Sequence, residues 1–595
     1  GDWSSDVCSS DLNLVTAFLF IATVLAREYK EYDHLDCIGN DIHQVEAREP
    51  EALKKICDET EGCVGFNTHG WLKKACPASE YQASVNLYLD SSIYIPTGKE
   101  PDILLWPMPT DYHSGDAIIT IDPINLRFHM NIESEELREA TQRFRKTIFT
   151  RRSNLAPEHS IVEITLEIDD PSAAFVLDKD ESYTLSVPAD GSAITIHASN
   201  IYGAYHALNS LLFLIQFDPV SAMYIIKHAP YKIADKPFLS YRGLMIDSSR
   251  HFLPLPAIKR MVDAMAWVKL NVLHWHLVDD EAFPMQFLSQ PTLWEGAYSL
   301  QERYTKFDIE EVVAYARARG VHVVPEFDMP GHAASWCVGD PSLCPSAECR
   351  SPLDPSNEHT FEVVEKLLSE AAMLFPSERF HVGGDEVDTR CWTETPRVAE
   401  WLKKMNFTAD EAYGYFEQRV DALVRKQGRR SIVWEEVFVH HAATLPKDTL
   451  VQIWLGDGEG LKNVVHAGFD AIVSNYKHWY LPQLWETWDY YYGNDFLKDI
   501  PKEEQHHIVG GEVCMWGEWV DISDLENTVF PRAVAAAERM WTQPELLDAE
   551  RAKERLPYIR CEYNRRGISA APTFLQGREA PSGPEIGRAS CRERV

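Results

Sequence analysis

From residue 240 onward, the chain alternates short apolar segments with longer amphipathic ones. The amphipathic stretches have helical spacing, for example at residues 256–268, 309–319 and 361–375. Eight short segments rich in β-branched and apolar residues are candidate strands: 244–247, 272–276, 321–327, 380–382, 431–434, 450–454, 470–474 and 508–516. Strands that alternate with helices over residues 240–575 predict a (β/α)8 TIM barrel, an α/β fold. The runner-up, an open doubly wound sheet, would need a Gly-rich first turn, which is missing.

Residues 102–236 show a different pattern. Apolar and polar positions alternate at 161–168 and 193–196, and a helical stretch follows at 202–216. Alternation followed by a helix predicts an α+β domain with an antiparallel sheet. The block holds no cluster of catalytic residue types, so we interpret it as a scaffold.

A small Cys-rich block, residues 28–98, comes first. It contains Cys37, Cys57, Cys63 and Cys76, and its segment C-D-E-T-E-G-C-V-G-F-N faintly resembles apple or PAN-type modules. Those modules are small disulfide-stapled domains that bind proteins or sugars. A family-specific extension held by two disulfides is the alternative.

The two ends look foreign to the protein. Residues 1–12 and 585–595 can be back-translated to complementary sequencing-adapter DNA, so we treat both as artefacts and exclude them from fold reasoning. Residues 13–26 carry a twelve-residue apolar run ending in Val-Leu-Ala, which fits the remnant of a secretory signal peptide. A membrane anchor is the alternative, and no other segment could span a bilayer.

Charge and cysteine content narrow the partners and the compartment. A formal net charge of −34 argues against nucleic acid or an anionic membrane surface. Without Cys8 and Cys591, ten of the twelve cysteines remain, and in a secreted chain they favour disulfides over metal sites. The sequon at Asn406 predicts N-glycosylation. We therefore expect the secretory pathway, with an extracellular or lysosomal or vacuolar destination.

Polar and aromatic residues gather where the barrel strands are predicted to end. In a (β/α)8 barrel, the carboxyl ends of the strands surround the active site. The residues at or just beyond these ends are Asp247, Arg250, Asp279, Asp280, Glu326, Asp328, His332, Asp385, Glu386, Trp434, Glu435, Trp454, Tyr480, Trp516 and Glu518. So many acids and aromatic residues at one rim predict an active site.

Individual residues in this set carry weaker signals. His274 and His276 share one face of a strand and could ligate zinc, but a structural role fits better because no matching Cys or His set lies nearby. The fork of Arg250 suits bidentate binding to sugar hydroxyls or a surface salt bridge. Adjacent Asp385 and Glu386 cannot flank a glycosidic bond from opposite sides, as the paired carboxylates of most glycosidases do.

Six ordered segments point to a known family: R-G-L-M-I-D-S-S-R-H-F-L-P, H-W-H-L-V-D-D, P-E-F-D-M-P-G-H, H-V-G-G-D-E-V, I-V-W-E-E-V-F and G-E-V-C-M-W-G-E. They resemble the signature segments of the β-N-acetylhexosaminidases, glycoside hydrolase family twenty, and the likeness covers residues 102–575. It implies removal of terminal β-linked N-acetylglucosamine or N-acetylgalactosamine from the non-reducing ends of oligosaccharides or glycoconjugates. The expected mechanism retains configuration and uses the substrate's own 2-acetamido group as nucleophile, a documented exception to the two-carboxylate scheme.

The resemblance also implies roles for single residues. Glu386 would be the general acid and base, Asp385 would orient the acetamido group, and Tyr480 would bind its carbonyl oxygen. The family's supporting Asp–His pair corresponds to Asp279 and His332. The substrate-binding residues would be Arg250, Trp434, Trp454, Trp516, Glu518 and Asp328. The family implies no cofactor or metal, and the sequence leaves a homodimer open.

The family pattern bears on the cysteines as well. It implies a Cys349–Cys391 disulfide, and Cys337 and Cys344 could close a short loop. Cys514 lies in a buried-looking strand and is expected to be a free thiol. Cys561 resembles a residue whose C-terminal partner the foreign end has removed, so we predict that Cys561 is unpaired.

One position departs from the family, and two other functions stay open. Pro482 stands two residues after Tyr480, where relatives generally carry Asp or Asn to bind a substrate hydroxyl; Gln483 could substitute. Preference between gluco- and galacto-configured substrates is therefore open. The alternatives to hydrolysis are a catalytically weak sugar-binding or adhesion protein, which intact Asp385, Glu386 and Tyr480 argue against, and a transglycosylase on the same scaffold.

Overall fold

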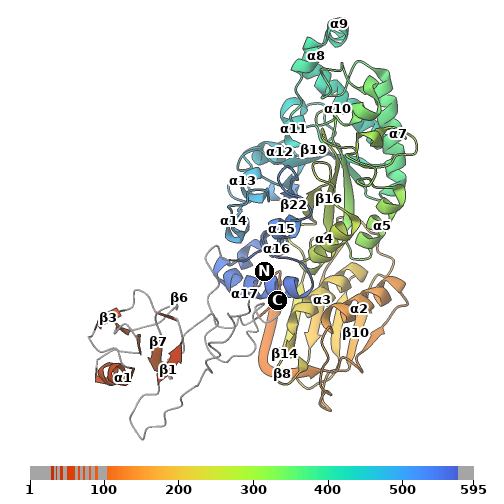
Figure 1. The fold of residues 1–595 in the computed structure, drawn as a ribbon. Coiled ribbons are helices and arrows are strands. Elements are labelled where there is room, and N and C mark those ends of the chain that lie inside the picture. The colour runs from red at the N-terminus through yellow and green to blue at the C-terminus, as the bar shows by residue number, and fades with distance from the viewer. Residues whose placement is uncertain are drawn as a thin grey trace, which may run out of the picture. The chain divides into compact units, whose positions relative to one another are not determined.

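The structure is a computed structural model that describes residues 103–573 and the secondary-structure elements between residues 29 and 90. The chain divides into two units (Figure 1). The first comprises residues 1–100 and 576–590, and the second comprises residues 101–575 and 591–595. The predicted signal remnant and both predicted artefactual ends lie outside the described residues.

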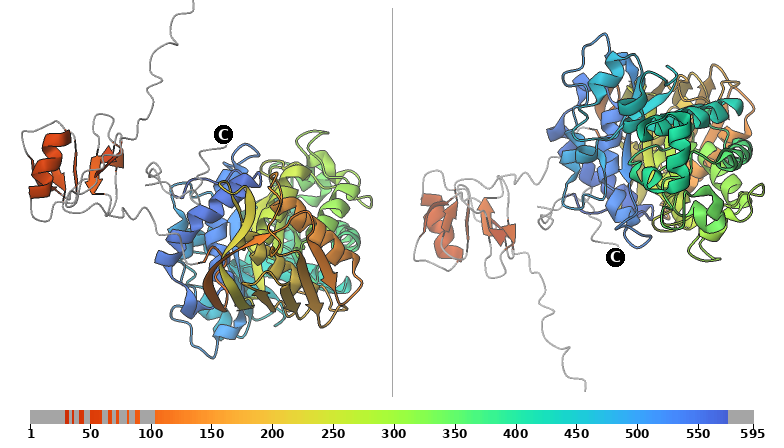
Figure 2. Two further views of the ribbon diagram at one scale, coloured as in Figure 1. Left: turned by 90° about the horizontal axis from the view of Figure 1, so that it is seen from below. Right: turned by 90° about the horizontal axis from the view of Figure 1, so that it is seen from above.

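The described part of the first unit contains a five-stranded antiparallel sheet and a helix, drawn in red-orange in Figure 2. The sheet order is β1 (Tyr29–Tyr32), β7 (Leu87–Asp90), β4 (Gly65–Asn67), β5 (Trp71–Lys73) and β3 (Asp41–Gln44), and β2 (Leu35–Asp36) pairs with β6 (Glu80–Tyr81). Helix α1 (Pro50–Glu59) buries Leu53 and Cys57, and Cys57 is disulfide-bonded. Cys37, Cys63 and Cys76 lie outside the described residues, so the two predicted disulfides of this block stay a prediction.

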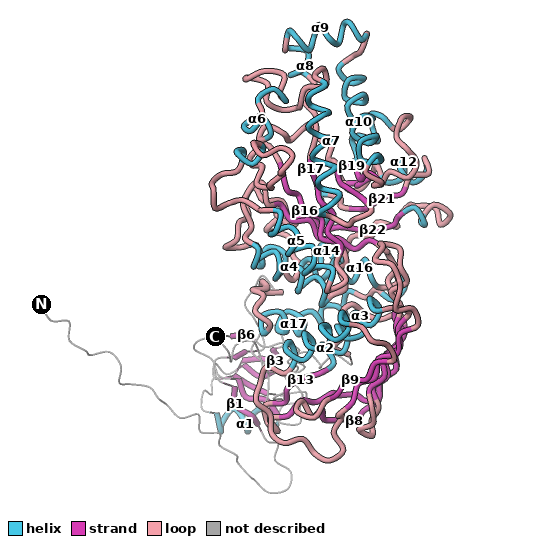
Figure 3. Tube along the Cα trace, turned by 90° about the vertical axis from the view of Figure 1, so that its right-hand side faces the viewer, coloured by secondary structure: helices cyan, strands magenta, loops and turns pink. Residues whose placement is uncertain are grey.

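The second unit opens with a seven-stranded sheet that carries two helices on one face. Along the sheet the order is β13 (Ile215–Asp218), β14 (Met223–Asp235), β11 (Tyr183–Val187), β12 (Ile194–Ala198), β10 (Glu163–Ile168) and β9 (Arg127–Met130), and β8 (Asp111–Ile121) also pairs with β14. Helices α2 (Glu135–Ile148) and α3 (Ile201–Leu214) lie between this sheet and the barrel (Figure 3). This explains why α3 is apolar on nearly all sides: it packs on strands below and on α4 (Leu255–Trp267) above.

This sheet is mixed, whereas the sequence predicted an antiparallel one. Strand β10 pairs in parallel with both β9 and β12, and the remaining pairs are antiparallel. The cause is the connection, because the chain leaves β9, passes through α2 and returns as β10. A strand–helix–strand crossover places its two strands in parallel. The helical pattern of residues 135–148 was not used in the prediction.

A closed barrel of eight parallel strands follows, as predicted. The strands are β15 (Tyr241–Asp247), β16 (Val272–Val278), β17 (His322–Phe327), β18 (Arg379–His381), β19 (Arg430–Trp434), β20 (Leu450–Ile453), β21 (Asp470–Val473) and β22 (Ile508–Met515). The longer helices around it are α4, α5 (Lys306–Arg317), α7 (Glu358–Leu374), α9 (Pro396–Met405), α10 (Ala409–Lys426), α16 (Arg532–Trp541) and α17 (Ala549–Arg565). Shorter ones are α6 (Trp336–Gly339), α8 (Arg390–Glu394), α11 (Glu435–His441), α12 (Leu461–His466), α13 (Tyr476–Trp479), α14 (Trp488–Tyr492) and α15 (Leu525–Val529). β22 pairs with β15 and closes the barrel.

The barrel interior is apolar near the start of the strands and polar above. One layer contains a residue from each of six strands: Tyr241, Val272, Val324, Ile432, Leu450 and Ile472. Residues further along the barrel strands, among them His274 on β16, Glu326 on β17 and Glu512 on β22, are also fully buried. Since the apolar layer closes the lower end, substrate can reach the barrel centre only from the carboxyl ends of the strands.

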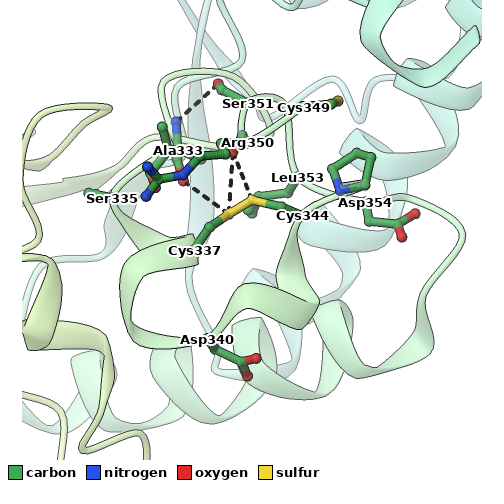
Figure 4. The surroundings of a disulfide bond; sticks show 12 residues. Ala333, Ser335, Cys337, Asp340, Cys344, Cys349, Arg350, Ser351, Leu353 and Asp354 are labelled. Carbon is green, nitrogen blue, oxygen red and sulfur yellow. Dashed lines mark hydrogen bonds between the residues drawn. A yellow bond between two sulfur atoms is a disulfide. The ribbon is translucent and has the colours of Figure 1, made fainter. Parts of the chain in front are cut away.

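The structure contains both disulfides expected within the barrel. Cys337 pairs with Cys344, next to the Arg350 carbonyl (Figure 4), and Cys349 pairs with Cys391. Buried Cys514 is free, as predicted.

The prediction that Cys561 is unpaired is wrong, because Cys561 is disulfide-bonded. The resemblance suggested which partner had been lost. It could not show that another sulfur lies within bonding distance, which the folded chain decides.

Asn406 is exposed and ends helix α9 in the left-handed conformation, with φ +55°. Its glycosylation stays a prediction. In the described part of the chain, no helix has the length and apolar character that crossing a bilayer requires.

Candidate active site

Asp385 and Glu386 lie in a tight turn immediately after β18. Gly383 and Gly384 adopt φ +71° and +92°, and Glu386 itself has φ +48°. On a continuing strand, two neighbouring side chains would point to opposite faces. Because the strand has ended, both carboxylates can approach one imidazole, that of His332.

The two glycines are required by space as well as by conformation. A Cβ on Gly383 would overlap the Asp328 carboxylate, and one on Gly384 would overlap Val437. Asp328 Oδ1 accepts a hydrogen bond from the Gly384 N–H at 3.2 Å, and Tyr413 donates its hydroxyl to the Gly384 carbonyl at 2.5 Å. The turn therefore fits closely against β17 and α10.

We expect Gly383→Ala to lower the free energy of unfolding by about 2 kcal/mol and to reduce activity sharply, since it combines backbone strain with overlap. Gly428→Ala is the matched control. Gly428 has φ +70°, but a Cβ there meets nothing within 4 Å. Denaturant unfolding and activity assays would separate the two effects. Equal losses of activity in the two variants would contradict the role given to the turn.

His332 joins the two acids of the turn to Asp279. Its Nε2 lies 3.4 Å from Glu386 Oε2 and 3.6 Å from Asp385 Oδ2, and its Nδ1 lies 3.1 Å from Asp279 Oδ1. Like Glu386, His332 has a positive φ, +50°. Strained backbone at two polar residues whose side chains are in contact is typical of functional sites.

Arg250 is surrounded by carboxylates. Its guanidinium lies 2.7 Å from Asp279, 3.1 Å from Asp247 and 2.9 Å from Glu281. Burial disfavours the charge, but these acids raise the pKa of Arg250 above its usual value. Only Glu281 is substantially exposed, so it is the partner that a bound hydroxyl can displace.

The pKa values of the acidic side chains around His332 are shifted in opposite directions from their usual values. Burial raises the pKa of Asp385 in spite of His332, and burial with the nearby Asp385 charge raises that of Asp328 far above normal. A hydrogen bond from His332 lowers the pKa of Glu386. Burial opposes protonation of His332, but the Asp385 charge and its hydrogen bonds raise its pKa well above normal. Divergent pKa values in one group of acids are typical of catalytic sites.

Four aromatic side chains form a box beside the acids. Trp454 stacks on Tyr480 with ring centroids 6.2 Å apart, Tyr480 lies 6.0 Å from Trp516, and Trp516 lies 5.9 Å from Trp434. The Arg250 guanidinium carbon lies 5.2 Å from the Trp516 ring centroid. This contact connects the box to the charged cluster, so the two halves form one site.

Glu518 is exposed in the loop after β22. The Gly517 N–H donates to Asp247 at 3.0 Å, which ties that loop beside Arg250. The carboxylate of Glu518 also contributes to the raised pKa of Arg250. Glu518 therefore lies at the rim of the barrel close to Arg250, the other residue that is expected to bind the sugar.

Sequence reasoning selected Glu435 after β19 and missed Glu436. Glu435 is buried and accepts from the backbone N–H groups of Trp454 and Leu455. Glu436 instead accepts from the Trp454 indole at 2.7 Å, and burial together with the Asp385 charge raises its pKa to about 7. The Glu-Glu doublet at a strand end was the available signal, but only the start of α11 decides which acid faces the site.

The neighbourhood of Pro482 is fixed by other contacts. The side-chain amide of Gln483 donates to the Tyr476 backbone carbonyl, and the Gln483 backbone carbonyl accepts from Arg532 at 2.8 Å. The amide nitrogen of Gln483 is thus already used within the protein.

The two strand histidines that could have bound zinc are held by acids. His274 lies 2.8 Å from Glu512, and His276 lies 2.8 Å from Asp279. Both also approach Glu326, as does His381 at 2.9 Å. His274, Glu326 and His381 are close enough together to hold a metal ion. Glu326 also accepts from the Trp434 indole at 2.8 Å, so its oxygens are already used as hydrogen-bond acceptors.

This chain is similar to known proteins along most of its length. The model described as "Glycosyl hydrolase family 20, catalytic domain" matches residues 239–544, and "beta-acetyl hexosaminidase like" matches residues 105–214. Beta-hexosaminidase 3 of Arabidopsis thaliana is 45% identical over 68% of this chain and 76% of its own length. Beta-hexosaminidase 1 of the same plant is 39% identical over 84% and 97%. The solved structure of Flavobacterium johnsoniae chitobiase superposes with a TM-score of 0.71 at 31% identity, covering 80% of this chain and 74% of that one.

Proposed function

The chain belongs to glycosyl hydrolase family 20 and is a glycoside hydrolase, and we propose that it releases terminal β-linked N-acetylhexosamine by a retaining, substrate-assisted reaction. The observation that best supports this mechanism concerns one carboxylate oxygen of Asp385. Its Oδ1 is buried and has no hydrogen-bond partner within the described residues. A buried carboxylate oxygen without a donor is costly, and a substrate N–H would satisfy it.

In the first step, the acetamido carbonyl oxygen attacks the anomeric carbon while the glycosidic bond breaks. Glu386 gives its proton to the departing oxygen. The product is a cyclic oxazolinium, whose positive charge Asp385 stabilises from the N–H side. Water then attacks the anomeric carbon and loses a proton to Glu386, while the bond from that carbon to the acetamido oxygen breaks and the acetamido group is restored. Two displacements at the same carbon retain the configuration.

Glu386 must hold a proton at the start, although His332 lowers its pKa in the free protein. The Glu386 side chain is 61% exposed, so bound sugar would remove much of its water. Desolvation raises a carboxyl pKa, and the proton on the adjacent imidazolium is then favoured on Glu386. We therefore expect an acidic working pH.

The remaining side chains would bind and orient the sugar. Trp434, Trp454 and Trp516 would enclose the ring, and the Tyr480 hydroxyl would hydrogen-bond the acetamido carbonyl. Arg250 and Glu518 would bind ring hydroxyls, and Asp328 would support the turn through Gly384. The secretory route, with an extracellular or lysosomal or vacuolar destination, remains part of this proposal.

Release of 4-nitrophenol from its N-acetyl-β-glucosaminide and N-acetyl-β-galactosaminide tests the proposal. The plain 4-nitrophenyl β-glucoside should be hydrolysed at least about 10³-fold more slowly, because it lacks the intramolecular nucleophile. No turnover of either N-acetylated substrate would contradict the function. Equal turnover of the plain glucoside would contradict only the mechanism.

A further inference from the structure

A chain of buried acids and imidazoles extends below the site. From the barrel centre upward, its members are Glu512, His274, Glu326, His276 and Asp279, and each is at most 1% exposed. Successive contacts measure 2.8 Å, 3.0 Å, 2.5 Å and 2.8 Å, and Asp279 then lies 3.1 Å from His332. Carboxylates and imidazoles alternate along this row of side chains, and the row ends at His332, whose imidazole contacts Glu386.

The links are not equivalent. His276 Nδ1 bonds to Glu326 and its Nε2 to Asp279, so both ring nitrogens are used. His274 Nε2 is at ion-pair distance from Glu326 but lacks hydrogen-bond geometry. The tight segment is therefore Glu326–His276–Asp279–His332, which we call the relay, and His274 is a branch below it.

The negative and positive charges of the relay residues offset one another in an interior from which water is excluded. Burial opposes every charge, but Glu326 holds the pKa of His276 well above normal, and His276 and His332 hold that of Asp279 low. Other charges near the relay are Arg250, which lies 2.7 Å from Asp279, and Asp247, which favours the His276 cation. His381 and His274 favour the Glu326 anion, and Asp385 and Asp328 favour the His332 cation. Buried charges in such a row depend strongly on their immediate neighbours.

We propose that His276 and Glu326 are positioning residues that hold Asp279 ionised and fixed beneath His332, and thereby control how tightly His332 and Glu386 share a proton. The inference rests on the proposed role of Glu386 as the acid. It extends the supporting pair Asp279–His332 by two residues into the barrel core.

The sign of the expected effect follows from charge. An imidazolium beside Asp279 disfavours protons on the groups above it. Replacing it with a neutral amide removes that positive charge, so the proton shared by His332 and Glu386 should be held to higher pH. The basic limb of the kcat/KM profile, which reports the free enzyme's acid, should then move upward by about half a pH unit or more.

The experiment is the pH dependence of kcat/KM for N,N′-diacetylchitobiose in the full chain, because the sugar that leaves from this substrate needs a proton from the acid. His276→Gln should shift the basic limb upward and lower kcat, because the amide cannot bond both Glu326 and Asp279 as the ring does. His274→Gln is the matched control, because His274 lies on the same strand as His276, is equally buried and contacts the same Glu326 oxygen. Its basic limb should move clearly less, because His274 lies one link further from Asp279 than His276 does.

Glu326→Gln, nearly isosteric, is the second variant if His276→Gln does not fold. It removes a negative charge while Asp279 and Asp247 still favour the His276 cation, so its basic limb should move in the opposite direction, to lower pH. Thermal melts establish folding before kinetics. An unshifted limb in His276→Gln, or equal shifts in His276→Gln and His274→Gln, would overturn the relay. Failure of both relay variants to fold would also overturn it, because their role would then be stability. An inactive unchanged protein would overturn the proposed function, and an active one with unshifted limbs would overturn only the relay.

Discussion

Glu386→Gln is expected to lower kcat on N,N′-diacetylchitobiose by about 10²- to 10⁴-fold, the usual contribution of a positioned acid and base. The loss should be smaller on the 4-nitrophenyl glycoside, because nitrophenolate departs without needing a proton. Gln keeps the size of the side chain and its contact with His332, so binding should change little. Initial-rate kinetics on the two substrates would measure the difference.

Asp388→Asn is the control for this variant. Asp388 lies two residues further along the same loop and is exposed, with its carboxylate paired to Arg390 at 2.6 Å. Its activity should match that of the unchanged protein. Equal turnover by the unchanged protein and Glu386→Gln would show that another group supplies the proton.

Asp385→Asn is expected to lower kcat/KM for N-acetylated substrates by about 10²- to 10³-fold, the range found when one stabilising group is removed from a charged transition state. The Asn carbonyl can still accept the substrate N–H. It cannot offset the positive charge that develops on the oxazolinium, so the loss falls on kcat more than on KM.

A second substrate identifies the cause of this loss. The plain β-glucoside has no acetamido group, so its slow residual hydrolysis should be almost unaffected by Asp385→Asn. Parallel losses on both substrates would mean that Asp385 acts on Glu386 or on the fold, and not on the acetamido group. The burial that raises the pKa of Asp385 also predicts that activity falls at low pH, as this carboxylate becomes protonated.

The barrel could be predicted because its strands are signalled locally. Each strand is buried on both faces, so β15, β16 and β17 read as uninterrupted runs of apolar or paired polar residues between amphipathic helices. The Gly-Gly pair before Asp385 likewise signalled a turn, because positive φ favours glycine.

The mixed sheet and Cys561 show where local signals end. Strand direction in the sheet depends on a helix between β9 and β10, and a disulfide depends on which sulfur the fold brings near. Neither is contained in a strand pattern or a cysteine count.

By itself, the sequence determined which residue types reach the rim of the barrel, because strand ends are set by local periodicity. Asp385, Glu386, His332 and Tyr480 were all identifiable on that basis. Only the tertiary structure decided their partners: His332 contacts both acids, Arg250 meets three carboxylates, and Glu436 faces the site in place of Glu435. Those contacts join strands and loops far apart in the chain. Their geometry and their pKa shifts depend on angstrom-scale packing and on exclusion of water, which no local pattern encodes.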